Sequence, residues 1–280
     1  MNKSNIAWVT DTTATLSPEF IKQHNIFVVP LFVIFGETAY KENVEISSAA
    51  FYQKLASSKE LPKTSQPSPG EMLELFKEIK EKYDHVIAIH VTGALTGAYN
   101  GAISAAEETN VDAFVVDSQI GSFPLGKMVE RAVALEQQGK TFEEIVTEIK
   151  SLPAKGRLYL TPGSLEQLHK GGRVTGTQTV LATLLNMKVI LKFHEGRAIL
   201  SDKVRSHKRA IAKMVDYLEV EKNQVKEVTI IHADNLKEAT QWKTTLQAQF
   251  SHISFSITEL SPVPGTHAGR GTIGLAWLGE

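Results

Sequence analysis

Three polar loops hold the side chains of this sequence that are best suited to bind an acidic group. They span residues 63–70, 92–99 and 262–272, and each lies beside a predicted strand. The loops combine hydroxyl side chains with glycine or proline, and the last one adds an imidazole. Hydroxyls and backbone N–H groups are neutral donors that bind carboxylates and phosphates. The sequence therefore indicates a binding site for an anionic group.

The loop at residues 92–99 lies between a strand that ends at Val91 and an alanine-rich helix. The N–H groups at the start of a helix attract anions, and the carboxyl ends of strands form the ligand crevice in an open α/β sheet. A simple helix cap needs one hydroxyl, whereas this loop has two hydroxyls and two glycines, among them Thr96 and Gly97. A helix cap and an anion site both remain open interpretations.

The other two loops also allow a structural and a functional interpretation. The adjacent hydroxyls of Thr64 and Ser65 precede a helix that is predicted to begin near Pro69, so a capped helix start explains them equally well. His267 lies in a glycine-rich turn before the last predicted strand. As a functional group, it is a candidate general base for an enzyme that acts on a small anionic substrate, with Thr64 or Thr96 holding the anion.

Two glycine-rich motifs have the form of nucleotide sites but lack essential parts. The segment Gly121–Lys127 resembles a phosphate-binding P-loop, but Met128 stands where magnesium needs a hydroxyl, and Pro124 has no N–H to donate. The segment Gly269–Gly274 matches the dinucleotide fingerprint, yet only six residues follow it, too few for the helix and strand that the motif requires. We therefore expect no nucleotide cofactor.

Thiol, metal and classical hydrolase chemistry find no support in the sequence. The chain has no cysteine, which excludes a thiol nucleophile and a thiolate metal site. Its nine histidines lack the spacing of metal-ligand pairs, and no Gly-x-Ser-x-Gly motif occurs. We expect a protein without a metal or a cofactor.

The charge of the chain is balanced, with 30 Lys and Arg against 31 Asp and Glu among 280 residues. Nucleic-acid-binding proteins normally carry a basic excess, so we expect no nucleic-acid partner. The longest apolar run, Ile26–Phe35, is interrupted by Pro30 and is shorter than the ~20 residues of a membrane helix. With no signal peptide at the N-terminus, these features predict a cytoplasmic protein without stable membrane insertion.

The first half of the chain alternates short β-branched runs with helical patterns. Strands are predicted at 6–10, 26–35, 86–91 and 113–116, and helices at 17–24, 47–57, 69–83, 96–108, 121–138 and 141–151. This alternation is typical of strands joined by crossover helices. We predict an N-terminal doubly wound α/β/α domain with a mostly parallel sheet at residues 1–153.

The second half has strands with too few residues between them for crossover helices. Strands are predicted at 157–160, 188–193, 198–201, 228–231, 253–258 and 273–277, and helices at 204–221 and 236–250. Three neighbouring pairs of these strands lack a helix-sized spacer, which favours antiparallel connections. We predict a C-terminal two-layer α/β domain with a mixed sheet at residues 154–280.

Six short segments, in their order and spacing, resemble the DegV family along the whole chain. They are Thr10–Thr13, Lys63–Pro67, Leu95–Gly97, Asp117–Ser118, Leu168–Arg173 and Gly265–Gly269. The resemblance implies a bacterial fatty-acid-binding protein of two α/β domains with the ligand between them. It also implies a partner, because the family's carriers present the acyl chain to a separate fatty acid kinase that phosphorylates its carboxylate.

The resemblance further assigns residues to the fatty acid carboxylate. The threonine of the family's Thr-Ser-Gln-Pro motif falls on Thr64, and the serine of its Leu-Ser-Gly-Thr motif falls on Thr96. Ser65 and Gly97 are predicted to lie beside them, and His267 matches a histidine near the head group. These five residues form the predicted carboxylate site.

The family pattern also predicts a docking face for the kinase and shows three departures in this chain. Arg173 and Arg205 match basic positions of that face. Thr96 stands where the family has serine, Ala98 where it has threonine, and Arg270 where many members have proline. The extra methyl group of Thr96 narrows the space beside the head group, while its hydroxyl is kept.

A long acyl chain can bind mainly through its tail. About fifteen buried methylenes at ~0.8 kcal/mol each contribute on the order of 12 kcal/mol before the cost of ordering the chain. Neutral hydroxyls then suffice for the carboxylate and tolerate an acyl phosphate. The leading hypothesis is a carrier that is not itself an enzyme. The small-anion enzyme with His267 as base, and a regulatory module that its lipid merely stabilises, stay open.

Overall fold

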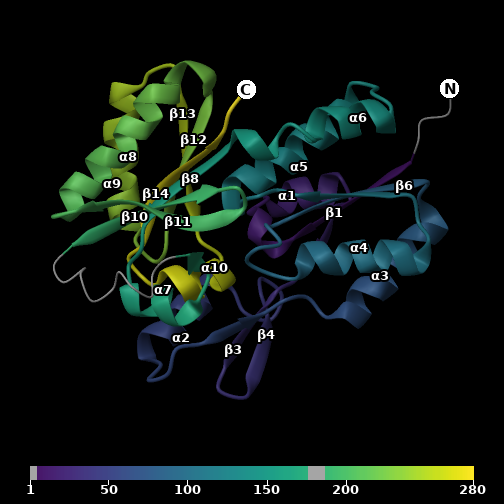
Figure 1. Cartoon of the computed structure of the whole chain (residues 1–280), viewed down its shortest axis with the longest axis horizontal. Coiled ribbons are helices and arrows are strands. Elements are labelled where there is room, and N and C mark those ends of the chain that lie inside the picture. The colour runs from purple at the N-terminus through teal and green to yellow at the C-terminus, as the bar shows by residue number, and fades with distance from the viewer. Residues whose placement is uncertain (1–4, 176–186) are drawn as a thin grey trace.

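The computed structural model describes residues 5–175 and 187–280 of the chain. Within these residues the strands form one parallel sheet of four strands, one mixed sheet of seven strands and one antiparallel sheet of three strands (Figure 1). The chain is thus a mixed α/β protein with a parallel and a mixed sheet, as the sequence predicted.

The parallel sheet has the strand order β2-β1-β6-β7. Its strands are β1 (Ile6–Asp11), β2 (Phe27–Val29), β6 (His85–His90) and β7 (Ala113–Asp117). The helices of this half are α1 (Pro18–Gln23), α3 (Pro69–Lys82), α4 (Ala98–Thr109), α5 (Ser122–Gln137) and α6 (Phe142–Ile149). Apolar side chains on one face of the sheet pack with α3 and α4, and those on the other face pack with α5. Helices on both faces make this half doubly wound.

The mixed sheet has the strand order β13-β12-β14-β8-β10-β11-β9. Its strands are β8 (Gly156–Thr161), β9 (Val174–Thr175), β10 (Lys188–His194), β11 (Arg197–Val204), β12 (Glu227–His232), β13 (Ser254–Glu259) and β14 (Ile273–Leu278). Two long helices, α8 (His207–Glu221) and α9 (Leu236–Gln249), cover one face through residues such as Met214 and Leu246. The predicted two-layer arrangement of this half is confirmed.

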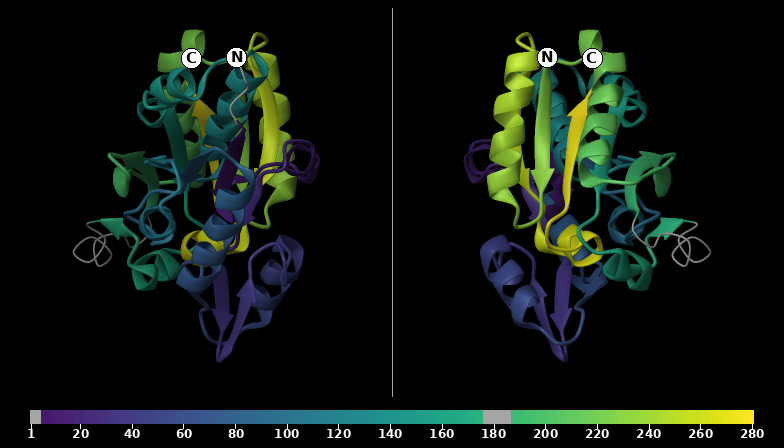
Figure 2. Two further views of the ribbon diagram at one scale, coloured as in Figure 1. Left: turned by 90° about the vertical axis from the view of Figure 1, so that its right-hand side faces the viewer. Right: turned by 90° about the vertical axis from the view of Figure 1, so that its left-hand side faces the viewer.

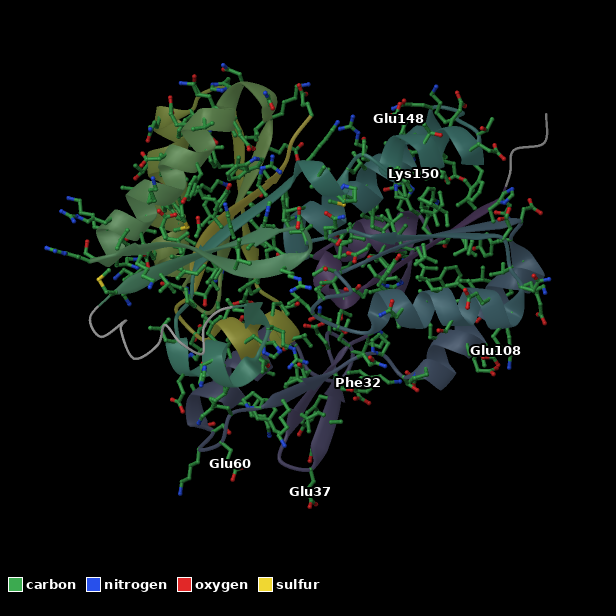
Figure 3. All side chains as sticks on the ribbon, in the orientation of Figure 1. Phe32, Glu37, Glu60, Glu108, Glu148 and Lys150 are labelled. Atoms are coloured by element: carbon green, nitrogen blue, oxygen red, sulfur yellow. The ribbon has the colours of Figure 1, made fainter. Side chains whose placement is uncertain are left out.

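The antiparallel sheet was missing from the sequence-based expectation. It consists of β3 (Phe32–Phe35), β4 (Thr38–Lys41) and β5 (Lys63–Ser65), and α2 (Ser48–Ser57) accompanies it. Figure 2 shows these elements projecting from the molecule on the side opposite to the C-terminus. The labelled side chains of Glu37 and Glu60 point outward at this end (Figure 3).

The single strand predicted over residues 26–35 is in fact two strands. β2 ends at Val29 and β3 begins at Phe32, so the chain leaves the parallel sheet at Pro30 and enters the antiparallel one. Proline has no N–H for a sheet hydrogen bond, which explains why the ladder stops there.

Two short helices also differ from the expectation. The glycine-rich turn predicted before the last strand contains helix α10 (Pro262–Ala268), and α7 (Leu165–Gly171) follows β8. The long helix predicted from residue 204 begins instead at His207, because Val204 ends β11 and Ser206 caps the helix.

The strands of the two large sheets fall on either side of the predicted domain boundary. Every strand of the parallel sheet precedes residue 153, and every strand of the mixed sheet follows it. The exact division between residues 153 and 154 stays a prediction. Among the described residues, no helix has the length and apolar character to cross a membrane.

Candidate functional site

One pocket of about 470 Å³ is lined by residues of the antiparallel and mixed sheets, of helices α5, α7 and α10, and of the segments that follow the strands of the parallel sheet. Its apolar lining residues are Leu31, Val91, Leu95, Leu158, Leu160, Leu168, Val174, Leu191, Phe193, Ala198, Leu260, Val263, Pro264 and Ala268. Its other lining residues are Thr13, Thr64, Ser65, Gln66, Thr96, Gly97, Gly121, Ser122, Arg173 and His267. The pocket is therefore mostly apolar with a limited set of polar groups, as small-molecule sites typically are.

Two polar side chains of the pocket are joined although they lie far apart in the sequence. Thr64 is in β5, where it pairs with Val33 of β3, and His267 is near the end of α10. A hydrogen bond of 2.9 Å joins Thr64 Oγ1 and His267 Nε2. The antiparallel sheet and α10 thus bring together the candidate residues of the first and third polar loops.

Buried polar contacts hold the start of α10 in place. The Val263 N–H donates to Glu42 Oε1 at 2.7 Å, and the Tyr52 hydroxyl donates to the carbonyl of Leu260 at 2.8 Å. The other carboxylate oxygen of Glu42 accepts a hydrogen bond from the Thr12 hydroxyl. Burial raises the pKa of Glu42, while these donors favour its ionised form. Glu42 and Tyr52 thereby fix the helix that carries His267.

His267 is a neutral imidazole at neutral pH. Burial and, to a smaller extent, the nearby positive charge of Arg173 lower its pKa from 6.5 to about 4. Its Nδ1 has no hydrogen-bond partner among the described residues. A Cβ atom at Gly171 would lie 2.4 Å from this Nδ1, so only glycine at the end of α7 leaves room for the ring.

The Thr96 hydroxyl is a second polar group of the pocket that lacks a partner. Its Oγ1 is buried and makes no hydrogen bond within the described part of the chain. The loop that carries it is well fixed, because Asp117 accepts from the N–H of Gly93 at 3.2 Å and Thr92 Oγ1 donates to the carbonyl of Gly196 at 2.8 Å. The loop therefore holds a hydroxyl without a partner in the described residues on a backbone that two hydrogen bonds fix in place.

Gly97 and Ser65 lie at the same end of the pocket, and Gln66 joins them. A Cβ atom at Gly97 would lie 1.8 Å from the side-chain oxygen of Gln66, so this glycine makes room for the amide. Ser65 is exposed where it lines the pocket. All five residues predicted for the carboxylate thus line one pocket.

The two arginines predicted for docking lie in different places. Arg173 is exposed, lines the pocket and donates to the carbonyl of Gly171 at 2.8 Å. Arg205 is exposed between β11 and α8 and does not line the pocket. Arg270, a departure from the family pattern, forms a surface ion pair in which its Nε lies 2.8 Å from Asp234. It therefore ties two loops together outside the pocket.

The acidic residue of the first resembling segment has an internal role. Asp11 is fully buried, and its carboxylate accepts hydrogen bonds from the N–H groups of Thr13 and Val91 and from the Thr13 hydroxyl. His90 Nδ1 lies 3.0 Å from the same carboxylate. Of these residues, Thr13 and Val91 line the pocket. Asp11 therefore stabilises the strand ends that support the pocket.

Sequence reasoning missed Glu42 and mentioned Gly171 and Gln66 only as parts of motifs. Glu42 carries no local signal, since its partners Thr12 and Val263 lie at distant sequence positions. Gly171 and Gln66 belong to two of the six segments that resemble the family. The sequence does not show that Gly171 lies against His267 or that Gln66 lies against Gly97.

The neutral donors of the site can bind an anion. For catalysis, the described residues supply a nucleophile and a base but no group that orients the base. A threonine hydroxyl beside a neutral imidazole has the distance of a nucleophile and its base. Such a base is normally oriented by a third group, and His267 Nδ1 contacts none in residues 5–175 and 187–280. Nor do those residues contain a cluster of three or more metal-binding side chains.

Comparison with known proteins identifies the family. The DegV family model matches residues 5–280. A DegV domain-containing protein of Halalkalibacterium halodurans is 37% identical over 281 residues, which cover 99% of each chain. The chain belongs to the DegV family. The recognition made from the six segments is thus confirmed.

Solved structures of the DegV family share this fold and are described as fatty acid binding proteins. The crystal structure of DegV from Bacillus subtilis, described as a fatty acid binding protein, has a TM-score of 0.91 at 33% identity and covers 99% of this chain and 100% of its own. A DegV family protein from Thermus thermophilus, described by its fatty acid binding, has a TM-score of 0.90 at 29% identity with the same coverage.

Proposed function

We propose that this protein binds a long-chain fatty acid with the tail in the apolar pocket and the carboxylate against Thr64, Thr96 and His267. The observation that carries the proposal is a mostly apolar pocket whose lining includes a threonine with a buried hydroxyl that has no partner among the described residues. A fatty acid has the matching chemistry, because its tail needs an apolar wall and its carboxylate needs donors. The fatty acid binding of the Bacillus subtilis and Thermus thermophilus family members supports this choice of ligand.

The head-group donors are neutral, which suits a carrier. The low pKa of His267 leaves its ring uncharged, and Ser65 and Gly97 add a hydroxyl and a backbone N–H close by. A carboxylate held by neutral donors is bound less tightly than one paired with a buried cation. The tail then supplies most of the affinity, and the head group stays available for chemistry performed elsewhere.

The proposal extends to a cytoplasmic carrier that presents its fatty acid to a separate fatty acid kinase, without an enzymatic activity or cofactor of its own. It follows the family resemblance and fits Arg173, an exposed cation at the pocket. Arg205 would contribute to the same contact from the start of α8. Charge reversal at Arg205 should weaken acyl-phosphate formation by the kinase and leave fatty acid binding intact.

The first experiment is native mass spectrometry of the purified protein, followed by extraction and identification of any bound molecule. We expect one C14 to C18 fatty acid per chain. A protein that stays empty after incubation with a fatty acid mixture contradicts the proposal. The small-anion enzyme with His267 as general base would then become the better hypothesis.

A threonine-to-valine pair tests the head-group site. Thr64→Val removes the hydroxyl with little change of volume and should weaken fatty acid binding by about 10- to 100-fold, the worth of one hydrogen bond to a charged group. Thr229→Val is the matched control, because Thr229 is buried and its hydroxyl lies 2.8 Å from that of Thr258, in the mixed sheet and outside the pocket lining. Equal affinities of the two variants in a binding titration would contradict the assignment of Thr64.

A further inference from the structure

Three residues of the pocket lining are exposed among the described residues, and all three are polar. They are Ser65, Gln66 and Arg173. The other residues that line the pocket are buried or half-buried. Exposed lining residues mark the opening of a pocket, so a hydroxyl, an amide and a guanidinium group lie at this opening.

Short contacts place two of these groups beside the head-group residues. Ser65 and Gln66 directly follow Thr64 in the sequence. The Thr64 hydroxyl lies 2.9 Å from His267 Nε2. The side-chain oxygen of Gln66 lies against Gly97, because a Cβ atom at this glycine would overlap it. This segment of β5 and the residue after it therefore spans from His267 to the start of α4.

Arg173 approaches the same site from the Nδ1 side of His267. Gly171 packs against the imidazole, because a Cβ atom at this glycine would overlap Nδ1. Arg173 Nη1 donates to the carbonyl of Gly171 at 2.8 Å, so one residue separates the guanidinium from the ring. After burial, the charge of Arg173 is the second cause that lowers the pKa of His267. The guanidinium is therefore close to the head-group site.

The three groups at the opening keep donors that the described residues do not use. Arg173 makes no ion pair within these residues, and its bond to Gly171 uses one of the five N–H groups of a guanidinium. An exposed guanidinium without a carboxylate partner favours an anion, and its planar set of N–H groups matches the oxygens of a phosphate. The Gln66 amide and the Ser65 hydroxyl can donate to the same oxygens.

A phosphate joined to the bound carboxylate would point towards this opening. The buried apolar residues of the pocket receive the tail of the proposed ligand, so a group added to its carboxylate extends away from them and towards solvent. A phosphate has more negative charge and more terminal oxygens than a carboxylate. It therefore needs donors in addition to Thr64, Thr96 and His267.

We propose that Arg173, Gln66 and Ser65 form a subsite that binds the phosphate group of an acyl phosphate. The protein then binds the acyl phosphate more tightly than the fatty acid, and it retains this product when the kinase dissociates. The inference rests on the proposed function and describes the product complex of the same site. It gives Arg173 a contact with the ligand in addition to its predicted role in docking.

The experiment is a binding titration of the delipidated protein with palmitic acid and with a stable analogue of palmitoyl phosphate, in which a methylene group replaces the bridging oxygen. The readout is the dissociation constant of palmitic acid divided by that of the analogue. In the unchanged protein this ratio should be about ten or more, which corresponds to one hydrogen bond between charged groups.

Two variants test the residues of the subsite. Arg173→Gln keeps a polar side chain but removes the charge, and it should reduce the ratio by about tenfold. Gln66→Met keeps the length of the side chain but removes the amide, and it should reduce the ratio by about threefold. Because each ratio compares two ligands with the same tail, a general loss of stability leaves it unchanged.

Arg205→Gln is the matched control for Arg173→Gln. Arg205 is also exposed, but it does not line the pocket. The control removes the same charge from the protein and therefore measures the general electrostatic attraction between the protein and the analogue. Its ratio should equal that of the unchanged protein.

Four results would overturn the inference. The first is a ratio near one in the unchanged protein, and the second is a ratio that Arg173→Gln or Gln66→Met leaves unchanged. The third is an equal loss in Arg205→Gln. The fourth is binding of inorganic phosphate to the protein loaded with palmitic acid that Arg173→Gln weakens, because the subsite would then receive a free anion.

These results can be distinguished from a failure of the proposed function. If the unchanged protein binds palmitic acid, the proposed function survives each of them. A failure to bind palmitic acid would instead remove the proposed function and this inference together.

Discussion

Two largely buried histidines of this protein have different surroundings, and the difference separates support from binding. His90 lies beside the carboxylate of Asp11, which also accepts three other hydrogen bonds and does not line the pocket. His267 lies beside a neutral hydroxyl, near an exposed arginine, and lines the pocket. Each ring leaves one nitrogen without a partner among the described residues.

The comparison teaches that a buried carboxylate whose donors come from the chain itself stabilises the fold, whereas an unpaired hydroxyl at a pocket is available to a ligand. The Asp11 cluster joins the ends of β1 and β6, so its partners come from the chain itself. In the second cluster, which consists of the pocket-lining residues Thr64, Thr96 and His267, the Thr96 hydroxyl has no partner among the described residues. Changes in the first cluster should therefore act on stability, and changes in the second on binding.

The largest effect is expected for Asp11→Ala. This change leaves the donors of Thr13 and Val91 unpaired in the interior and should lower the free energy of unfolding by about 4 kcal/mol. Urea unfolding followed by circular dichroism measures it. A loss below about 1 kcal/mol would mean that the cluster does not stabilise the strand ends and would break the comparison.

The second prediction concerns pH and His267. Its pKa falls from 6.5 in the unfolded chain to about 4 in the folded protein, so the unfolded chain binds more protons between these values. The contribution of His267 to the free energy of unfolding is therefore most favourable above about pH 6.5 and falls as the pH decreases towards about 4. Between about pH 7 and about pH 4.5 this group should remove about 2 kcal/mol.

His267→Gln isolates that contribution, because glutamine does not titrate. The free energy of unfolding of both proteins, measured at the two pH values, should fall by about 2 kcal/mol more in the unchanged protein. If both lose the same amount, the imidazole is not held in its neutral form by burial.

The smallest effect, on binding alone, is expected for Gly171→Ala. The new methyl carbon would lie 2.4 Å from His267 Nδ1 and should displace the ring, which weakens fatty acid binding by about tenfold. Gly101→Ala is the matched control, because Gly101 lies in α4 with open space around it. Alanine in a helix should stabilise the control by about 0.5–1 kcal/mol and leave its affinity unchanged.

The two alanine variants are compared by thermal unfolding and by a fatty acid titration. Weaker binding of Gly171→Ala at preserved stability would show that Gly171 positions the histidine. Unchanged binding would mean that the ring position does not matter for the ligand.

Elements with strong local signals could be predicted from the sequence. Ser17 caps a helix that begins with Pro18, and Thr141 and Glu144 form a capping box at the start of α6, where helices were predicted over residues 17–24 and 141–151. Such signals act within four residues, so no knowledge of the rest of the chain is needed. The alternation of strands and helices likewise gave the parallel sheet and the mixed sheet.

Elements that depend on distant partners were not predicted. β4 and β5 have three or four residues each and exist because β3 pairs with both. α10 contains Pro264 and Gly265, which are poor helix formers, and its first turn is fixed by Glu42. These contacts are long-range, so local sequence patterns do not reveal them.

The sequence by itself determined the family, the two large sheets and the residue types of the head-group site. Spacing and local propensity are properties of neighbouring residues, and the six segments carry them in order. Tertiary structure alone decided that Thr64 bonds to His267 and that Gly171 makes room for the ring. The physical reason is that hydrogen bonding and close packing depend on distances in space, which only the folded chain defines.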